Sequence, residues 1–258
     1  MTQEPLVACT VEDGIGRLVL NDPEHRNALS RKLSDDLASA VDQALEAGAR
    51  ALVLTARPPV FCAGGALDGL LSRATPLAEM YAGMMRLAEA PVPTIAAVGG
   101  PAIGAGVNLP LACDVIICSP QARFDPRFLD VAIHPGGGHL WRLAERVGTQ
   151  GAAALVLCGD QLPGDEAARC GLAWHCVPAE ELEPTALRLA GRAASRSASL
   201  IRRTKETLRR SVRLQDVRDA VQLELEAQQW SIEQPEFPET VQRIQRELAE
   251  ARKRPSRT

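Results

Sequence analysis

The sequence lacks an excess of charge of either sign, a paired cysteine motif and a secretion signal. Its formal net charge at pH 7 is -3 in 258 residues, so electrostatics provides no overall attraction to nucleic acid or to an anionic membrane. The seven cysteines form no Cys-x-x-Cys pair, and together with the four histidines they show no metal-ligand spacing. The first ten residues contain no basic segment followed by an apolar block. We therefore expect a cytoplasmic protein that binds no nucleic acid and no metal.

The sequence also lacks an uninterrupted apolar segment that could cross a membrane. The longest uncharged run, Ala90 to Cys113, is long enough for a transmembrane helix. Pro91, Pro93 and Pro110 interrupt it, as does the turn signal Gly99-Gly100-Pro101. The run therefore predicts a strand, a turn and a helix, and we expect no membrane insertion.

Segments with strand and helix patterns alternate up to about Val177, which predicts an α/β fold with a largely parallel sheet. Ser30 is a suitable N-cap for a helix that runs to about Ala47. Residues 122–135 are expected to be irregular, and Leu172–Val177 is expected to be a strand.

After Pro178 the pattern is helical only, and its charge differs from that of the preceding chain. From Arg188 to the end there are 16 Lys and Arg against 10 Asp and Glu, a net charge of +6, whereas the remainder has 13 against 22, a net charge of -9. We therefore expect two parts, a core over residues 1–195 and a helical oligomerisation region over residues 196–258.

A glycine-rich stretch at Val98–Asn108, V-G-G-P-A-I-G-A-G-V-N, follows an apolar strand and precedes a helix predicted from Ile103 to about Cys113. The first N–H groups of a helix have no intrahelical partner, and the helix dipole adds partial positive charge there. The stretch lacks the Lys-Ser/Thr of a phosphate-binding P-loop and does not match G-x-G-x-x-G. A second small-residue loop, Phe61–Gly65, also follows a short strand. Two such loops can present two N–H donors to one carbonyl oxygen, although tight strand–helix packing would explain the same glycines.

Further motifs accompany these two loops, and their order and spacing resemble the crotonase (enoyl-CoA hydratase/isomerase) family. The resemblance covers roughly residues 6–250 and implies a spiral of ββα units followed by a helical trimerisation region, assembled as a homotrimer or a hexamer made of two trimers. The motifs that carry it are Arg26-Asn27-Ala28-Leu29 within 21–30, Phe61-Cys62-Ala63-Gly64-Gly65, 100–108, Pro135-Gly136-Gly137-Gly138, Gly159-Asp160 and Ala167 with Gly171-Leu172.

The resemblance assigns roles to particular positions of this chain. The backbone N–H groups of Gly65 and Ala105 would form an oxyanion hole, with Ala105 in the first turn of its helix. Coenzyme A would enter as the thioester substrate, and no permanently bound cofactor is implied. The residues expected to hold it are His25, Arg26, Ala28, Ala63, Gly65, Ala66 and Leu67.

The chain departs from the family at the two glutamates that hydratases use to activate water and to handle the proton at the α-carbon. The first glutamate position holds Asn108, and the second holds Phe128. Asparagine can hydrogen-bond a water molecule but cannot take its proton, and phenylalanine can do neither. Because each missing acid or base costs about 10²–10⁴ in rate, ordinary hydration is expected to be weak.

Other side chains could supply the acid or the base. Asp130 and His134 lie in the segment that replaces the second glutamate, His139 follows the glycine triplet, and Asp68 follows the loop Phe61–Gly65. Each has a plainer interpretation, as a packed or surface histidine or as a loop-capping carboxylate. Cys62 is interpreted as a core residue because no base is placed to activate it. A local polar pair is expected for Asp125 and Arg127.

These observations predict an enzyme of the enoyl-CoA hydratase/isomerase type that stabilises a thioester enolate. A different reaction through the same enolate, such as isomerisation, hydrolysis or decarboxylation, is an open alternative. A non-catalytic acyl-CoA-binding protein that keeps the fold is the alternative of another class.

Overall fold

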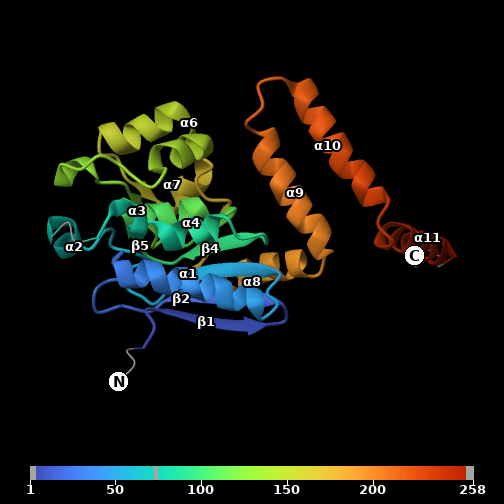
Figure 1. The fold of residues 1–258 in the computed structure, drawn as a ribbon, viewed down its shortest axis with the longest axis horizontal. Coiled ribbons are helices and arrows are strands. Elements are labelled where there is room, and N and C mark those ends of the chain that lie inside the picture. The colour runs from blue at the N-terminus through green and yellow to red at the C-terminus, as the bar shows by residue number, and fades with distance from the viewer. Residues whose placement is uncertain (1–3, 73–74, 254–258) are drawn as a thin grey trace, which may run out of the picture. The chain divides into compact units, whose positions relative to one another are not determined.

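The computed structural model describes residues 4–72 and 75–253, and the chain divides into two compact units, Met1–Ala198 and Ser199–Thr258 (Figure 1). Each unit is described by itself below. Within the described residues, no helix combines the length and the apolar character that crossing a membrane requires.

The first unit is built on a six-stranded sheet in the order β1-β2-β3-β4-β6-β9. β1 and β2 are antiparallel and joined by a tight turn at Asp13-Gly14, and every other neighbouring pair is parallel. The predicted largely parallel sheet is therefore confirmed, although the last strand is shorter than the predicted Leu172–Val177. The strands are β1 (Val7–Glu12), β2 (Ile15–Leu20), β3 (Ala51–Ala56), β4 (Thr94–Val98), β6 (Val115–Cys118) and β9 (His175–Cys176).

A second, three-stranded sheet forms from the segments that follow the main strands. It consists of β5 (Pro101–Ile103), β7 (Arg123–Asp125) and β8 (Leu162–Pro163), in the order β5-β7-β8. β7 and the 3₁₀ helix η2 (Leu129–Val131) lie in the region expected to be irregular. The sequence pattern does not reveal β5 or β7 because strands of three residues are too short to show an alternating pattern.

Helices connect successive strands of the first unit. α1 begins at the predicted N-cap, where the Ser30 hydroxyl accepts a hydrogen bond of 3.1 Å from the Leu33 N–H. Gly148 has non-helical angles within α6, so α6 consists of two helical segments joined at a kink. The helices are α1 (Arg31–Glu46), α2 (Leu67–Ser72), α3 (Leu77–Met80), α4 (Ala82–Ala88), η1 (Gly104–Val107), α5 (Asn108–Ala112), α6 (His139–Leu157), α7 (Gly164–Arg169) and α8 (Ala179–Ala194).

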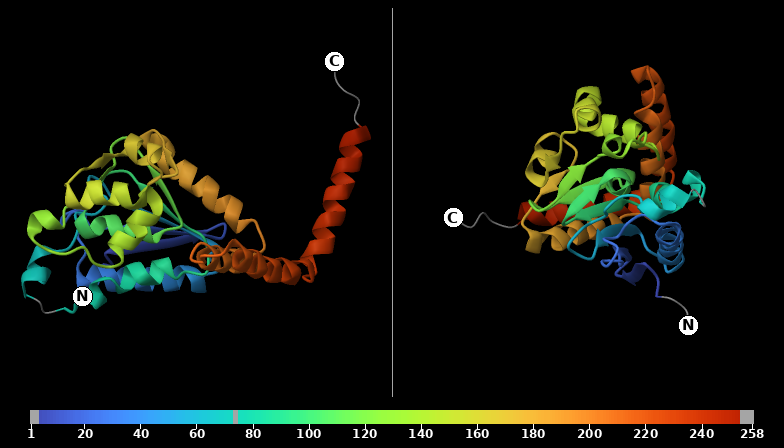
Figure 2. Two further views of the ribbon diagram at one scale, coloured as in Figure 1. Left: turned by 90° about the horizontal axis from the view of Figure 1, so that it is seen from above. Right: turned by 90° about the vertical axis from the view of Figure 1, so that its left-hand side faces the viewer.

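Both faces of the main sheet are buried, which explains why its central strands are apolar along their whole length. In β3, Leu52 and Leu54 belong to the core beneath α1, whereas Ala51 and Val53 face α8 on the other side. Figure 2 gives two further views of the sheet and its helices. This two-sided packing holds the carboxyl ends of β3 and β4 in fixed positions, and the two glycine loops start there.

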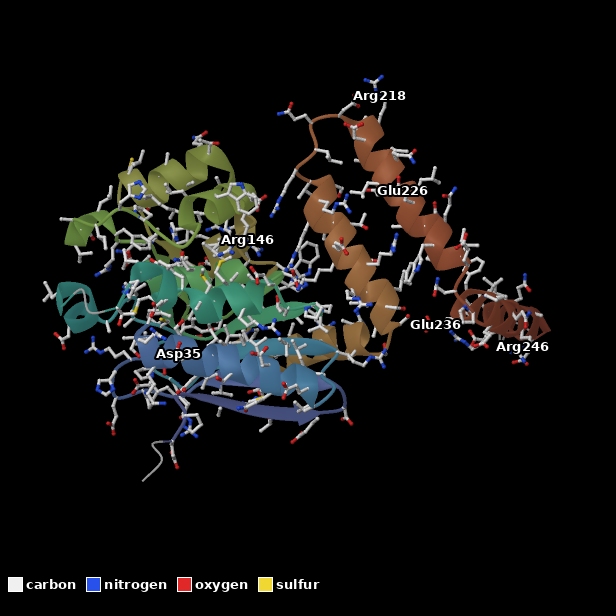
Figure 3. All side chains as sticks on the ribbon, in the orientation of Figure 1. Asp35, Arg146, Arg218, Glu226, Glu236 and Arg246 are labelled. Atoms are coloured by element: carbon white, nitrogen blue, oxygen red, sulfur yellow. The ribbon has the colours of Figure 1, made fainter. Side chains whose placement is uncertain are left out.

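The second unit contains α9 (Ala198–Ser211, which starts at the boundary), α10 (Val217–Ile232) and α11 (Glu236–Lys253). The Arg203 guanidinium lies 4.7 Å from the ring centre of Trp230, which holds α9 against α10. Figure 3 shows charged side chains such as Arg218, Glu226 and Arg246 projecting from α10 and α11. Many large apolar side chains of this unit are also exposed, among them Leu208, Val212, Val217, Val221, Ile232, Ile244 and Leu248.

The contact between α1 and the segment α3–α4 provides a test of this packing. The Ser34 hydroxyl is fully buried, accepts a hydrogen bond of 2.9 Å from Gly83 N–H and donates one of 3.1 Å to the Glu79 carbonyl. Ser34→Ala leaves both backbone groups without this partner, so the free energy of unfolding is expected to fall by about 1–3 kcal/mol. Denaturant unfolding measures it, and Ser195→Ala, which removes an exposed hydroxyl, is the control. Equal stability of the two variants would contradict the prediction.

Candidate functional site

The two loops identified in the sequence lie side by side and are joined by backbone hydrogen bonds. The carbonyl of Pro101 accepts from the N–H groups of Phe61 and Cys62 at 3.0 and 3.2 Å, and Ile103 N–H donates to the Cys62 carbonyl at 2.9 Å. Cys62 and Ala102 thereby form a parallel bridge. The end of β3 is thus continued against β5, and both loops open at the same place.

Two glycines allow this close approach. A side-chain carbon on Gly106 would lie 2.4 Å from the Cys62 carbonyl oxygen, and one on Gly64 would lie 2.8 Å from that of Ile103. Gly64 also has a φ of +95°, which glycine adopts without strain. The point where a Gly64 side chain would begin is only 3.7 Å from the Ala105 nitrogen. Larger residues at these positions would separate the loops.

The backbone N–H groups of Gly65 and Ala105 have no acceptor among the hydrogen bonds formed by the described residues. Gly65 lies opposite Leu29 in an isolated parallel bridge, but that bridge uses the Gly64 carbonyl and the Ala66 N–H instead. Ala105 lies in the first turn of η1, which leads directly into α5, so the helical segment spans residues 104–112. Initial N–H groups of a helix have no intrahelical partner. Two neighbouring loops therefore each present one free donor.

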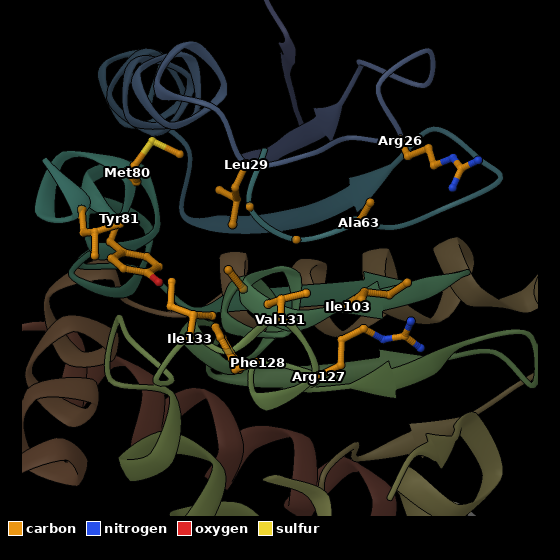
Figure 4. Close-up of a pocket in the computed structure, with 15 residues that line it drawn as sticks. Arg26, Leu29, Ala63, Met80, Tyr81, Ile103, Arg127, Phe128, Val131 and Ile133 are labelled. Atoms are coloured by element: carbon orange, nitrogen blue, oxygen red, sulfur yellow. The ribbon is translucent and has the colours of Figure 1, made fainter. Parts of the chain in front are cut away.

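Gly65 and Ala105 both line a cavity of about 280 Å³, which Figure 4 shows in close-up. Its wall combines the two loops with side chains from α3, Tyr81 and the segment 127–133, and it is mostly apolar. None of the described residues lining it is Asp, Glu or His. The lining residues are Arg26, Leu29, Ala63, Gly64, Gly65, Leu77, Met80, Tyr81, Ile103, Gly104, Ala105, Arg127, Phe128, Val131 and Ile133.

The two ends of the cavity differ in charge. In Figure 4 the guanidinium groups of Arg26 and Arg127 lie toward one end, while Met80 and Tyr81 lie at the other. Asp125, whose side chain is only 3% exposed, accepts a hydrogen bond of 3.0 Å from Arg127 Nε and is also paired with Arg127 Nη2. The expected local pair of Asp125 and Arg127 is therefore present, and it raises the pKa of Arg127. A buried carboxylate thus holds one guanidinium at the cavity, and the same cation also lines its wall.

The side chain of Asn27 ties the loop that carries Arg26 to the segment that leads into the loop Phe61–Gly65. This fully buried side chain donates hydrogen bonds of 3.0 and 2.8 Å to the carbonyls of Arg57 and Val60. Its oxygen accepts a bond of 2.8 Å from Asp22 N–H. Asn27 has a φ of +53°, and Arg26 has a φ of +55°. The strained turn is therefore held by three hydrogen bonds, and it brings Arg26 to the cavity.

The residues expected to hold coenzyme A occupy one side of this region, and some of them line the cavity. Arg26, Ala63 and Gly65 line it, whereas His25 is exposed and lies 2.8 Å from an Asp22 oxygen, which raises the His25 pKa. The Ala66 N–H donates to the Leu29 carbonyl at 2.9 Å. Of the remaining two, Ala28 is half-buried in the same turn, and the Leu67 side chain lies outside the described part of the structure.

Asn108 and Phe128, the two positions where the family resemblance implies glutamate, are brought together at His139, and both side chains are buried. Phe128 lines the cavity and is 5% exposed. Asn108 is 1% exposed, donates a hydrogen bond of 3.0 Å from Nδ2 to the Gly136 carbonyl, and has Oδ1 2.7 Å from His139 Nδ1. The ring centres of His139 and Phe128 are 4.9 Å apart in an edge-to-face arrangement. One histidine therefore contacts both replaced positions.

The other acid–base candidates lie outside the cavity wall. Asp130 and His134 are exposed, and His134 Nδ1 is 2.8 Å from the Pro135 carbonyl oxygen. Asp68 is exposed in the first turn of α2. Cys62 is fully buried, and burial raises the pKa of its thiol to about 12. A protonated, buried thiol is a poor nucleophile, which agrees with a core role for Cys62.

Sequence reasoning missed several residues of the cavity wall. Tyr81, Val131 and Ile133 line the cavity, and burial raises the Tyr81 phenol pKa, so the phenol is protonated at neutral pH. Tyr81 is the only tyrosine in the chain, and that rarity was the one available signal. It packs against Gly136 and Gly137, where side-chain carbons would lie 3.0 Å or less from its ring or hydroxyl.

Comparison with known proteins identifies the family of this chain. The family model for enoyl-CoA hydratase/isomerase matches residues 10–251. The "Probable enoyl-CoA hydratase EchA14" of Mycobacterium tuberculosis is 37% identical over 248 residues, which cover 92% of this chain and 96% of the relative.

Solved structures give the same result. The enoyl-CoA hydratase of Bacillus anthracis is 27% identical, with a TM-score of 0.86 over 94% of this chain and 96% of that one. A Thermobifida fusca protein solved in complex with CoA is 28% identical, with a TM-score of 0.79 over 88% of this chain and 93% of that one. The crotonase-like fold predicted from the sequence is therefore confirmed, and this chain belongs to the enoyl-CoA hydratase/isomerase family.

Proposed function

We propose that this protein is an acyl-CoA-processing enzyme that holds the thioester carbonyl oxygen between the N–H groups of Gly65 and Ala105 and stabilises an enolate there. The observation that carries the proposal is that Gly65 and Ala105, one from each glycine loop, line a mostly apolar cavity and have N–H groups with no acceptor among the described residues. Donors that are preorganised in an environment with little water stabilise a developing oxyanion far more than water does. The partial positive charge at the start of η1 and α5 adds to this effect.

The two ends of the cavity suit the two ends of an acyl-CoA. Leu29, Met80 and Ile133 offer apolar contacts for an acyl chain. Arg26 and Arg127 offer two guanidinium groups at the opposite end, which suit the phosphates of coenzyme A. The solved Thermobifida fusca relative contains CoA, which supports this class of ligand. No permanently bound cofactor is needed for an enolate reaction of this kind.

Proton transfer at the α-carbon is favoured over hydration. Asn108 and Phe128 replace the two glutamates, and no carboxylate is among the described residues of the cavity wall. Isomerisation or another reaction through the same enolate is therefore proposed to exceed hydration of a 2-enoyl-CoA. The absence of a carboxylate also supports the alternative of a non-catalytic acyl-CoA-binding protein, so the test must measure binding and turnover separately.

The donor assignment is tested with a panel of 2-enoyl-, 3-enoyl-, 3-keto- and saturated acyl-CoA thioesters, with binding followed by calorimetry. Ala105→Pro removes one N–H at a helix start, where proline is tolerated. Turnover of the best substrate is expected to fall about 10²–10³-fold. Ala179→Pro, the same change at the exposed start of α8, is the matched control. Unchanged turnover in a folded Ala105→Pro variant would show that the donor is misassigned, and binding without turnover by the wild type would favour the binding protein.

The proposed contact between Arg127 and the phosphates of coenzyme A is tested by comparing Arg127→Gln with Arg123→Gln. Arg123 Nε lies 4.0 Å from the same Asp125 carboxylate, but Arg123 does not line the cavity. Loss of a charge-assisted contact to phosphate is expected to raise KM for a CoA thioester about tenfold in Arg127→Gln. The pantetheine thioester of the same acyl group lacks the nucleotide phosphates, so its KM should not change. A rise in KM for both thioesters, or in both variants, would contradict the assignment.

We also propose that the second unit mediates assembly into a homotrimer or a hexamer. Its helices expose a run of large apolar side chains that a monomer would leave in water, including Leu208, Val212, Ile232 and Leu248. Light scattering at micromolar concentration is expected to give three or six times the chain mass of 27.6 kDa. A monomer under these conditions would contradict the proposal.

A further inference from the structure

His139 is placed between the two side chains that replace the family's glutamates. Its Nδ1 is 2.7 Å from Asn108 Oδ1, and its ring meets the Phe128 ring at an interplanar angle of 64°. Asn108 comes from the start of α5, Phe128 from the segment before η2, and His139 from the start of α6. Three separate segments of the chain therefore converge on one imidazole.

The hydrogen bonds of Asn108 determine which His139 nitrogen carries the proton. The Gly136 carbonyl can only accept, so the Asn108 atom facing it, at 3.0 Å, is the NH₂ group. Asn108 then presents its oxygen to His139 Nδ1, which must donate. In the neutral imidazole the other nitrogen, Nε2, therefore carries a lone pair and no hydrogen.

That Nε2 atom is buried and has no hydrogen-bond partner within the described part of the chain. His139 as a whole is only 1% exposed. Leaving a buried acceptor unpaired costs about 1–3 kcal/mol, which a purely structural residue would avoid. Burial lowers the His139 pKa to about 4, so the ring is neutral at physiological pH.

Among the described residues, no charged group contributes to the shift in the His139 pKa. Two ionisable groups contact its segment: Tyr81, which packs on Gly137, and Arg142, which donates to the Gly137 carbonyl at 3.1 Å. Neither is an anion at neutral pH, and burial is the cause of the shift in the His139 pKa. The imidazole therefore remains in its proton-accepting form.

Phe128 separates this nitrogen-bearing ring from the cavity. Phe128 lines the cavity wall and contacts the His139 ring, whereas His139 is not among the described residues that line the cavity. The position of the Phe128 side chain would therefore decide whether a ligand in the cavity reaches the imidazole.

We propose that His139 is the proton acceptor of this enzyme, with Asn108 fixing its tautomer and Phe128 controlling access to Nε2. The inference rests on the proposed acyl-CoA function. In the step, the bond between the α-carbon and its hydrogen breaks, and the proton moves to the Nε2 lone pair. The freed electron pair forms the enolate double bond, and the carbonyl π pair moves onto the oxygen between Gly65 and Ala105. Return of the proton to carbon restores the neutral ring.

Exchange of α-hydrogens measures this step without needing the physiological substrate. Butyryl-CoA is incubated with the full-length protein in D₂O, and loss of the α-CH₂ signal is followed by proton NMR. His139→Gln is expected to lower the exchange rate about 10²–10⁴-fold, with CoA binding by calorimetry unchanged. His175→Gln, at an exposed position in β9, is the control and should match the wild type.

A second variant makes a prediction of opposite sign and does not depend on the His139 variant being folded. Phe128→Ala removes the ring between His139 and the cavity, so kcat for exchange is expected to rise several-fold. Phe128→Ala combined with His139→Gln should lose that gain. A purely structural histidine would produce neither the gain nor its loss.

Specific results would overturn the inference. If a folded His139→Gln variant exchanges α-hydrogens at the wild-type rate, the inference is wrong and the proposed function stays intact. Loss of exchange in Asp130→Asn or His134→Gln, with His139→Gln unaffected, would assign the base to one of those exposed residues instead. A kcat in folded Phe128→Ala no higher than that of the wild type would also contradict the inference. Failure of the wild type to bind any CoA thioester would remove the proposed function itself, and the inference with it.

Discussion

The backbone pairing between residues 61–62 and 101–103 is the interaction on which the candidate site depends. It continues the ends of β3 and β4 beyond the main sheet and brings two loops within contact distance. The pairing is possible because Gly64 and Gly106 have no side chain where the opposing carbonyl groups lie. Since the main sheet is packed on both faces, the loops cannot drift apart without disturbing the core. The two free N–H groups are therefore positioned by the backbone rather than by mobile side chains.

The described residues of the cavity wall around this rigid part include no carboxylate. Asn108 and Phe128, at the positions where the family resemblance implies glutamates, instead contact a buried imidazole. Removing carboxylates lowers the cost of desolvating the cavity, because each buried anion would need a partner. In the proposed mechanism, the acid–base group is instead a neutral ring. A cavity of this kind suits substrates and intermediates whose only developing charge lies on the thioester oxygen.

The carboxylate of Asp125 affects both the stability of its segment and the charge at the cavity wall. Asp125 is buried and would be costly without a cation, so its pairing with Arg127 contributes to the stability of the segment. The same pairing immobilises a guanidinium at the cavity wall, opposite Arg26. An expected local polar pair thus also acquires a place in the candidate site. The local sequence predicts only that Asp125 and Arg127 pair. Whether the pair faces the cavity depends on the position of β7 in the folded protein.

Much of the fold could be predicted from patterns within short windows. The Ser30 cap, the apolar strands β3, β4 and β6, and the run of helices after Pro178 all follow from local preferences that survive in the folded protein. The short strands β5 and β7 could not be predicted, because three-residue strands owe their existence to the neighbours they pair with. Asp130 and His134 looked like acid–base candidates because they are close in sequence to Phe128, yet the chain turns them toward solvent.

The sequence alone determined the family resemblance, the two glycine loops and the presence of Asn108 and Phe128 where that resemblance implies glutamates, because these are properties of residue identity and spacing. Only the tertiary structure decided which side chains meet at the cavity. Asn108 and His139 are 31 residues apart, and their hydrogen bond exists because α5 and α6 pack together. Burial, which sets the charge of His139 and the protonation of Tyr81, is likewise a property of packing and not of composition.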